Sequence, residues 1–267
     1  MSEEREHRTF CRVCNAMCGL VVTSGADDRV LRIRGDDEHP LSRGYTCPKG
    51  RAVGALHHDP RRLDHPQLGR GAERRTVPWD EMLDDLAARI DEARTVHGSD
   101  SVAMYLASGS AFDTAGRRAA ERFLALLGSQ QRYTATTIDT PCKPLVAEAV
   151  GGWSGLTPVW DHEAGSLLLL FGTNPVVSHG HSNAIPDPVR RLREFRARGG
   201  EIWVFDPRRT ETATLADHHV QLAPGTDWLV LAWLVRQLLA DADVRRDAEL
   251  RATGVDLLAG RARAARS

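Results

Sequence analysis

The chain has 267 residues, of which 42% are hydrophobic and 27% are charged, and its formal net charge is −1. These values are ordinary for a globular protein with a sizeable core, and they make nucleic acid and anionic membranes poor default partners. The longest apolar stretch, residues 228–235, is far shorter than the roughly 20 residues that a membrane-spanning helix needs.

The N-terminus and the cysteine distribution indicate a compartment and a kind of site. Residues 1–9 are charged and lack the apolar core of a secretory signal, and no twin-arginine signal precedes the first cysteine. We therefore expect a cytoplasmic protein. Four of the five cysteines lie within the first 47 residues, and such a set in a cytoplasmic chain predicts metal binding rather than disulfides.

The spacing of these four cysteines favours an iron–sulfur cluster. Cys11, Cys14 and Cys18 are close together, and Cys47 follows at a distance. A [4Fe–4S] cluster takes four cysteine ligands. A structural zinc site is the alternative, but it usually shows two close ligand pairs, and Cys47 has no near partner. Short strand-like runs at residues 20–22 and 30–33 predict a small β-rich [4Fe–4S] module over residues 8–62.

The chain has only two lysines among its 35 basic residues, and both lie beside cysteines. Lys49 follows Cys47 by two residues, and Lys143 follows Cys142 directly. Lysine is a compact point charge and arginine a planar fork, so the two are not interchangeable at tight sites. The alternative is a chance placement in an arginine-rich composition.

Strands and helices alternate after a proline- and glycine-containing linker at residues 57–75. Such alternation predicts a doubly wound, mostly parallel α/β domain, which we place at residues 63–245, with residues 246–267 as a C-terminal tail that is either a helix or frayed. The expected strands are apolar runs at residues 102–107, 166–171, 201–205 and 219–222, of which the first two are expected to be buried. A first helix is expected from the apolar face that runs from Trp79 to Ile90, and a second should end at Gly128. A third should begin at Asp187-Pro188 and end at Gly199-Gly200, and a fourth should cover residues 227–241.

Three polar loops follow strands of this predicted sheet, where ligands of doubly wound folds bind. They are Gly172-Thr173-Asn174-Pro175, Asp206-Pro207-Arg208-Arg209-Thr210 and Pro224-Gly225-Thr226-Asp227. A glycine at a strand end lets the backbone approach a phosphate, an acidic residue can hold ribose hydroxyls, and an arginine can bind a pyrophosphate. Taken singly, each loop is equally compatible with an ordinary turn.

Together these motifs resemble a known family. Cys11-Arg12-Val13-Cys14, Cys18-Gly19 and Cys47-Pro48-Lys49-Gly50 resemble the opening of molybdopterin oxidoreductases of the dimethyl-sulfoxide-reductase superfamily, which includes formate dehydrogenases and nitrate reductases. The three loops, with Ala216-Asp217 between the last two, are similar to the guanine-dinucleotide-binding loops of that superfamily. The resemblance covers about residues 8–240, and its two halves agree independently.

The resemblance implies cofactors and roles for individual residues. The four clustered cysteines would hold the [4Fe–4S] cluster, and Lys49 would lie between cluster and pterin and help electrons pass. The alternative for Lys49 is a solvated surface ammonium. The residues implied to contact a molybdopterin guanine dinucleotide are Gly172, Asn174, Pro175, Asp206, Arg208, Thr210 and Asp227.

Cys142 is the candidate protein ligand to molybdenum or tungsten, because the family carries this ligand between the second helix and the Gly172 loop. A thiolate beside the Lys143 cation suits a soft metal. A buried structural cysteine is the alternative, and formate dehydrogenases place their ligand a few residues further along relative to Val150-Gly151. Asp139 is a second candidate, and some members have no protein ligand.

His179 is the candidate proton-transfer residue. Ser178-His179-Gly180 resembles a Ser-His-Pro stretch that lines the substrate pocket of formate dehydrogenases, and His181 follows closely. A histidine there could assist proton transfer at a metal-bound group. A hydrogen-bonded structural histidine is the alternative for both.

We therefore expect a molybdenum- or tungsten-dependent bis-pterin enzyme that carries out two-electron redox chemistry on a small formate- or nitrate-like substrate. Electrons would pass through the cluster to a ferredoxin, flavoprotein or NAD(P)H-linked subunit. The alternative is a non-catalytic electron-transfer subunit, similar to the large iron–sulfur subunit of respiratory complex I, but retention of the pterin loops favours the enzyme. Family members are much longer, so we expect a truncated form or a partner chain that supplies the C-terminal half.

Overall fold

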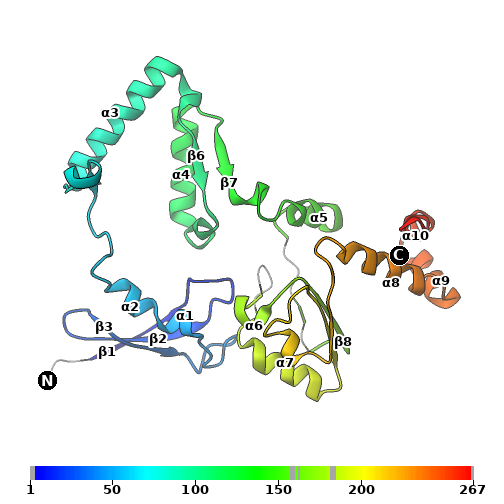
Figure 1. The fold of residues 1–267 in the computed structure, drawn as a ribbon. Helices are drawn as coiled ribbons and strands as arrows, with labels where there is room; N and C mark the ends of the chain where they lie inside the picture. The colour runs from blue at the N-terminus through cyan, green and yellow to red at the C-terminus, as the bar shows by residue number, and fades with distance from the viewer. Residues whose placement is uncertain (1–3, 157–159, 162, 181–184, 266–267) are drawn as a thin grey trace. The chain divides into compact units, whose positions relative to one another are not determined.

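The computed structural model describes residues 4–156, 160–161, 163–180 and 185–265 (Figure 1). The chain divides into two compact units, and each is considered by itself. The first unit comprises residues 1–7, 22–33 and 48–158, and the second comprises residues 8–21, 34–47 and 159–267.

The cysteine-rich N-terminal segment is built from short strands and two short helices. Strands β1 (Arg5–Phe10), β2 (Gly19–Ser24) and β3 (Val30–Gly35) form a sheet in the order β1-β2-β3. Helices α1 (Pro48–Arg51) and α2 (Val53–His57) follow. Nearly every residue of β2 is buried, which agrees with its run of apolar side chains. The strand-like runs predicted at residues 20–22 and 30–33 are therefore confirmed.

A parallel sheet forms the centre of the second unit. Strands β8 (Leu167–Phe171), β9 (Glu201–Phe205) and β10 (His218–Val220) lie in the order β10-β9-β8. Both pairs are parallel. Helices α6 (Pro175–Ser178) and α7 (Pro188–Ala197) connect β8 to β9, and α7 lies along one face of the sheet (Figure 1). This βαβ crossover and the parallel pairing confirm the predicted α/β class.

The core of the second unit lies between α7 and β9. Leu192 and Phe195 of α7 pack with Ile202 and Val204 of β9 and with Ala213. All five side chains are buried. The helix spacing of Leu192 and Phe195 and the period-two spacing of Ile202 and Val204 place each pair on one face of its element. Burial of these apolar faces holds the helix on the sheet.

Residues at both ends of α7 explain why the helix begins and ends where it does. The Asp187 carboxylate accepts a hydrogen bond from the Arg190 backbone N–H, and Pro188 occupies the first turn. At the other end Gly199 has φ +86°, and the N–H of Gly200 donates to the Phe195 carbonyl. The predicted start and stop of this helix are confirmed.

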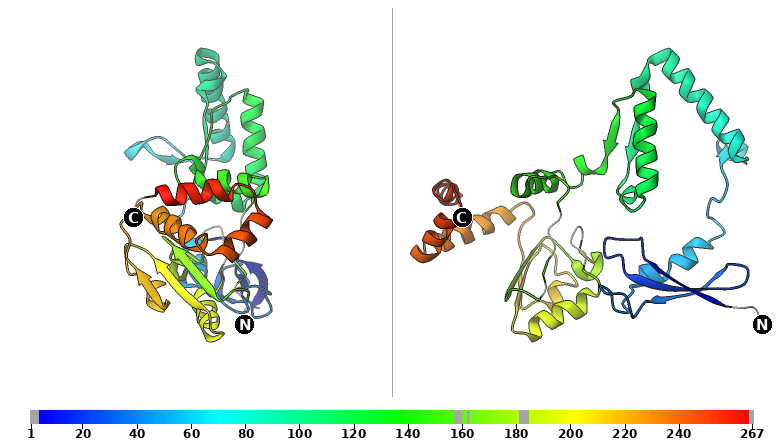
Figure 2. Two further views of the ribbon diagram at one scale, coloured as in Figure 1. Left: turned by 90° about the vertical axis from the view of Figure 1, so that its right-hand side faces the viewer. Right: turned by 180° about the vertical axis from the view of Figure 1, so that it is seen from behind.

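The first unit carries a second, smaller parallel pair. Strands β6 (Met104–Leu106) and β7 (Arg132–Thr134) pair in parallel, and α4 (Thr114–Leu127) lies beside them in Figures 1 and 2. The α4 helix ends at Gly128, as predicted, with φ +74°. The remaining elements are β4 (Gln67–Leu68), β5 (Arg75–Thr76), α3 (Trp79–His97), α5 (Cys142–Gly151), and 3₁₀ turns at Gly71–Glu73, Ser99–Ser101, Ser108–Phe112, Ala135–Thr137 and Ala213–Leu215.

Two strands expected to be buried are partly exposed. Tyr105 of β6 and Leu167 and Leu169 of β8 are exposed. They belong to small sheets of two and three strands. Among the described residues, too few elements pack on these sheets to cover both of their faces. The predicted apolar face of α3 is likewise exposed at Trp79 and Leu83. Local apolar patterning predicted the elements correctly but not the extent of their burial.

Three helices end the second unit. They are α8 (Asp227–Leu238), α9 (Ala242–Arg251) and α10 (Val255–Ala264), and α10 packs across α8 (Figure 2). The Asp241 carboxylate caps α9 by accepting from the backbone N–H groups of Asp243 and Val244. Residues 246–267, for which a helix or a fraying tail is expected from the sequence, include most of α9 and all of α10. Within the described residues, every helix is too short or too polar to cross a bilayer.

Truncation of the α7 core should unfold the second unit more readily than truncation of an exposed leucine. Leu192 is 1% exposed and Leu250 on α9 is 81% exposed. We expect Leu192→Ala to lower the free energy of unfolding by about 3 kcal/mol, because a buried cavity remains. The matched variant Leu250→Ala should change it by less than about 0.5 kcal/mol. Urea unfolding followed by Trp fluorescence measures both, and equal effects would contradict this position of the core.

Candidate functional site

The first three cysteines lie on the loop that joins β1 to β2. The Cys11 N–H donates to the Cys18 carbonyl at 2.8 Å, and this bond closes the loop. Within it the Met17 N–H donates to the Cys14 carbonyl at 3.2 Å, and Met17 has φ +41°. Cys11 and Cys18 are buried, and Cys14 is half-buried. The close spacing seen in the sequence is therefore folded into one tight loop.

The segment before Cys47 folds back onto the start of β2. The Gly19 N–H donates to the Ser42 hydroxyl at 3.0 Å, and the Asp36 N–H donates to the Gly19 carbonyl at 3.0 Å. Ser42 is fully buried, and its hydroxyl also contacts Nδ1 of His39 at 3.0 Å. These bonds bring the distant fourth cysteine back toward Cys18.

Two glycines allow this return. A Cβ atom on Gly35 would lie 1.9 Å from the carbonyl oxygen of Gly44. Real Cβ atoms do not approach backbone so closely, so Gly35 is required by the contact. Gly44 itself has φ +81°, a conformation that residues with side chains rarely adopt.

The four thiols are close enough to affect one another electrostatically. Burial, followed by the charges of Cys14, Cys11 and Cys47, raises the pKa of the Cys18 thiol to about 11. Four converging thiolates repel one another, and the positive charge of iron would offset this repulsion when iron displaces the thiol protons and binds. The donor set therefore fits the four-thiolate requirement of a [4Fe–4S] cluster. No three His, Cys, Asp or Glu side chains among the described residues meet the geometry for a single metal ion.

The strand-end loops of the second unit emerge from a single edge of the sheet. Phe171, Phe205 and Val220 are the last residues of β8, β9 and β10, and they lie in register. The rings of Phe171 and Phe205 stack with centroids 4.3 Å apart. Because all three strands are parallel, the three predicted ligand-binding loops leave from the same side.

In the first loop Gly172 is exposed to solvent, whereas Asn174 is hydrogen-bonded to the second loop. Gly172 is exposed with φ +55°, and nothing lies within 4 Å of the position a Cβ would take. The Asn174 side chain instead faces the second loop. Its Oδ1 accepts from the Thr212 hydroxyl at 2.7 Å, and its Nδ2 donates to Glu211 at 2.7 Å. Asn174 therefore joins two loops of the predicted site.

Pro175 and Thr210 are buried within these loops. Pro175 begins α6, and the Thr210 hydroxyl accepts from the Ala213 N–H at 3.1 Å. Both side chains are occupied in building the loops, so their contribution to ligand binding would be to hold backbone in place. Thr212, which the sequence reading did not single out, is fully buried and accepts from the Val176 N–H at 3.2 Å.

Three predicted residues remain accessible at the edge. The Asp206 carboxylate accepts from the Arg208 backbone N–H at 2.8 Å, and the Arg208 guanidinium is exposed 3.6 Å from Glu211. Asp227 is half-buried at the first position of α8. An exposed guanidinium and two carboxylates at one sheet edge suit a ligand with phosphate and hydroxyl or amino groups.

The Asp217 carboxylate of the Ala216-Asp217 pair has a structural role. It accepts from the Ile202 N–H at 2.9 Å and from the Arg196 guanidinium at 2.8 Å. These hydrogen bonds hold the pKa of Asp217 below its usual range, the Ile202 N–H being the largest cause. The carboxylate thereby fixes the turn between β9 and β10.

The remaining candidates lie on other elements. Lys49 is exposed in α1, two residues after Cys47. Cys142 is exposed at the first position of α5, and Asp139 is exposed just before it. His179 is buried at the end of α6 and contacts Tyr45, a residue that sequence reasoning did not find. His181 lies outside the described residues.

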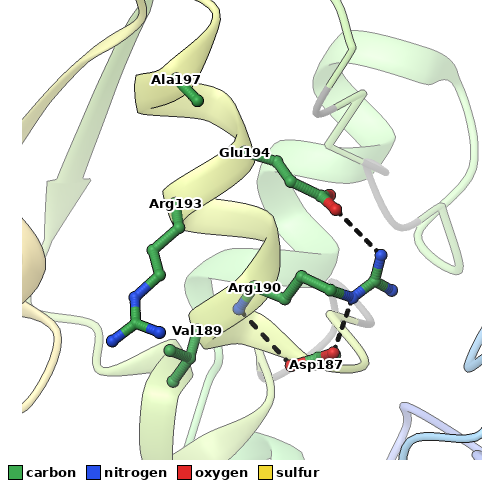
Figure 3. Close-up of a pocket in the computed structure, with 6 residues that line it drawn as sticks. All are labelled: Asp187, Val189, Arg190, Arg193, Glu194 and Ala197. Atoms are coloured by element: carbon green, nitrogen blue, oxygen red, sulfur yellow. Dashed lines mark hydrogen bonds and ion pairs between the residues drawn. The ribbon is translucent and has the colours of Figure 1, made fainter.

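Two surface hollows are lined by none of the predicted site residues. One lies on α7 and is lined by Asp187, Val189, Arg190, Arg193, Glu194 and Ala197 (Figure 3). Its Arg190 is already paired with Asp187 at 2.7 Å and with Glu194 at 3.0 Å. Another lies beyond the ends of β6 and β7 and includes Leu106 and Thr134. Neither contains the cysteines or the strand-end loops of the second unit.

Two protein-family models match the chain and together cover most of it. The family described as the molybdopterin oxidoreductase Fe4S4 domain matches residues 4–58. The family described as molybdopterin oxidoreductase matches residues 62–243, more than half of the chain.

The chain belongs to the molybdopterin oxidoreductase family. This confirms the predicted resemblance and the pairing of an iron–sulfur cluster with a molybdopterin cofactor at the level of the family. The individual site residues stay predictions.

Curated relatives of this molybdopterin oxidoreductase chain include a nitrate reductase and a formate dehydrogenase. The chain is 30% identical to the nitrate reductase of Klebsiella oxytoca over 251 residues, covering 91% of this chain and 27% of the relative. It is 28% identical to the formate dehydrogenase-O major subunit of Escherichia coli strain K12 over 271 residues, covering 91% and 25%. The chain thus spans about a quarter of the length of these two relatives.

A solved structure shares the fold. Acetylene hydratase from Pelobacter acetylenicus superposes with a TM-score of 0.77 at 20% identity, covering 97% of this chain and 35% of that chain. At this identity the likeness concerns the fold alone, and it agrees with the predicted α/β architecture.

Thr212 should be needed for the joined strand-end loops. Thr212→Val keeps the side-chain shape but removes the acceptor of the Val176 N–H, and it leaves the Asn174 side-chain Oδ1 with the Thr212 backbone N–H as its remaining donor from this residue. We expect it to lower the free energy of unfolding by about 1–3 kcal/mol, because buried polar groups lose their hydrogen bonds. The same change at exposed Thr214 should have an effect below about 0.5 kcal/mol. Chemical unfolding tests this, and a neutral Thr212→Val would show that the loops do not depend on the hydroxyl.

Proposed function

We propose that this chain forms the N-terminal portion of a molybdenum- or tungsten-dependent bis-molybdopterin-guanine-dinucleotide oxidoreductase. The reaction proposed is two-electron redox of a small formate- or nitrate-like substrate, with electrons passing through a [4Fe–4S] cluster. One observation carries the proposal. Four convergent thiols and three strand-end loops at one sheet edge lie in the same compact unit.

The four N-terminal cysteines all have the same proposed role. Cys11, Cys14, Cys18 and Cys47 are the proposed cluster ligands, and the raised pKa of Cys18 supports their convergence. Lys49 follows the fourth ligand at the start of α1. We assign it to the electron path between cluster and pterin, where a compact ammonium can stabilise passing negative charge.

The pterin part assigns the dinucleotide to the edge of β8, β9 and β10. The exposed Gly172 leaves room for a phosphate against the backbone, and Arg208 supplies a guanidinium for the pyrophosphate. Asp206 and Asp227 supply carboxylates for ribose and guanine groups. Asn174, Pro175 and Thr210 hold the loops in shape. An electron-transfer subunit without pterin would have no physical need for all three of these dinucleotide-binding loops.

The bound pterin-held metal would supply the two-electron chemistry, and the protein positions and tunes it. Cys142 is the proposed side-chain ligand, and its exposure at the start of α5 leaves the thiol accessible. Asp139 is the second candidate. His179 was expected to assist proton transfer, but both of its ring nitrogens lie against protein groups. We therefore assign His179 a positioning role.

Exposed apolar side chains indicate a protein partner, and the proposed cluster indicates a redox partner. Trp228, Leu231 and Trp233 of α8 are exposed, as are Leu145 and Val146 of α5. Large exposed apolar patches mark interaction sites. We propose that the remaining length of the family, on the same or another polypeptide, covers them and holds the second pterin. A ferredoxin, flavoprotein or NAD(P)H-linked subunit in the cytoplasm is the proposed redox partner.

Iron content tests the cluster assignment. Anaerobically purified chain should contain about four iron per chain and show broad visible absorption that bleaches with dithionite. Cys14→Ser should lose most of this iron, because serine is a poor substitute for a thiolate ligand. Cys142→Ser is the matched control and should keep it. Stoichiometric zinc without iron in the unaltered chain would refute the proposal.

Metal retention tests the need for the rest of the family's length. The strand-end loops of β8, β9 and β10 provide for one dinucleotide, so the 267-residue chain by itself should hold little molybdenum or tungsten per cluster. Co-expression with the C-terminal remainder should raise that ratio severalfold and restore turnover of formate or nitrate. Near-stoichiometric metal with full turnover from the chain by itself would contradict this division of roles.

A further inference from the structure

A part-buried hydrogen bond joins the cysteine segment to the loop after β8. The Tyr45 hydroxyl lies 2.8 Å from Nε2 of His179, although the two residues are 134 positions apart in the sequence. Their rings are also in contact range, with centroids 5.8 Å apart and a tilt of 42°. His179 is only 4% exposed. Both residues lie in the second unit.

The surroundings of His179 decide the direction of this bond. Its Nδ1 lies 3.2 Å from the Val177 carbonyl oxygen, which can only accept a hydrogen bond. Nδ1 therefore carries the proton, and the lone pair on Nε2 accepts from the Tyr45 hydroxyl. The backbone is held too, because the His179 N–H donates to the Pro175 carbonyl at 2.8 Å and the residue adopts φ +60°.

Tyr45 lies close in sequence to the fourth cysteine, so its hydrogen bond can hold that cysteine's backbone in place. Tyr45 stands two residues before Cys47, and its N–H donates to the carbonyl of Ser42 at 2.9 Å. Ser42 in turn holds Gly19, the residue that follows Cys18. On the other side, His179 ends the short helix that begins at Pro175, directly after the Gly172 loop. The bond thus lies between the fourth cysteine and a predicted dinucleotide loop.

A second contact joins the same two regions. The Arg191 guanidinium of α7 donates to the Leu41 carbonyl at 3.0 Å and to the Pro186 carbonyl at 2.7 Å. Leu41 lies in the segment that returns to Cys47, and Pro186 lies just before α7. Tyr45 and His179 are therefore not an isolated contact, and their two rings add packing area to it.

We propose that Tyr45 and His179 form a positioning pair that fixes the Cys47 segment on the loop after β8, so that the fourth cluster ligand stays in place. The inference rests on the proposed [4Fe–4S] assignment of Cys47. Cys47 is the ligand that depends most on such a fixture, because the other three share one closed loop. Neither residue ligates iron. Both act through the backbone that carries the ligand.

Two substitutions break the bond from opposite sides. Tyr45→Phe removes the hydroxyl and keeps the ring. His179→Asn tolerates the left-handed backbone but is too short to reach Tyr45. His179→Gln keeps a side-chain acceptor at greater reach and serves as the conservative rescue. Tyr133→Phe is the matched control, since that hydroxyl donates to Gln131 on the exposed surface at 2.5 Å.

The first measurement is the rate at which the anaerobically purified chain loses iron to a chelator. We expect Tyr45→Phe and His179→Asn each to speed iron loss roughly threefold to tenfold, the factor that one neutral hydrogen bond contributes. The double variant should be no faster than either single variant, because both remove the same bond. His179→Gln and Tyr133→Phe should stay near the unaltered rate. Iron loss from Tyr45→Phe at the unaltered rate, or multiplied effects in the double variant, would overturn the pair.

The second measurement is amide hydrogen exchange of the iron-free chain, which does not depend on the cluster. Exchange should rise in Tyr45→Phe at residues 42–47 and 175–180 and stay unchanged in β9. A rise throughout β8, β9 and β10 would mean general loss of stability and would overturn the positioning role. If the unaltered chain binds no iron while the local exchange changes as expected, the cluster assignment fails and the contact stands by itself.

Discussion

Parallel, in-register pairing of β8, β9 and β10 is the constraint on which the rest of the site depends. It places the ends of all three strands at one level, so loops from residues 172, 206 and 221 onward leave the sheet together. The pairing is held from one face by Leu192 and Phe195 of α7 against Ile202 and Val204. A slip of one residue would turn the β9 side chains to the opposite face and expose that core. The hydrophobic pattern therefore also fixes the polar site.

The polar groups at this edge divide into those that build the loops and those that face outward. Hydrogen bonds to other protein groups hold the side chains of Thr212, Asn174 and Thr210, while Arg208 and Gly172 remain accessible. Buried, satisfied polar networks hold backbone rigidly, and a rigid backbone is what a phosphate-binding loop requires. The family motif thus combines scaffold and contact residues in one short sequence. The same division appears in the cysteine module, where Ser42 and Gly19 hold the backbone between ligands.

Much of this could be predicted from the sequence, because the signals are local. Asp187-Pro188 and Gly199-Gly200 mark the ends of α7, Gly128 ends α4, and alternation of elements gives the parallel sheet. The contact between Tyr45 and His179 could not, since no local pattern relates residues so distant in sequence. The orientation of Asn174 toward Thr212 was hidden for the same reason. Burial of β6 and β8 was overestimated, because an apolar run identifies a strand without identifying what covers it.

The close approach of Gly35 and Gly44 has a consequence for how this segment tolerates evolutionary change. With a Cβ position 1.9 Å from the Gly44 carbonyl oxygen, a side chain at residue 35 would force the backbone at Gly44 to move. Insertions or deletions between these two glycines would displace Ser42 from Gly19. The turn between β2 and β3, closed by the Gly25 N–H on the Arg29 carbonyl, carries no such contact and has exposed side chains at its tip. Length variation between Cys18 and Cys47 should therefore accumulate at residues 26–29 and be purged from residues 35–44.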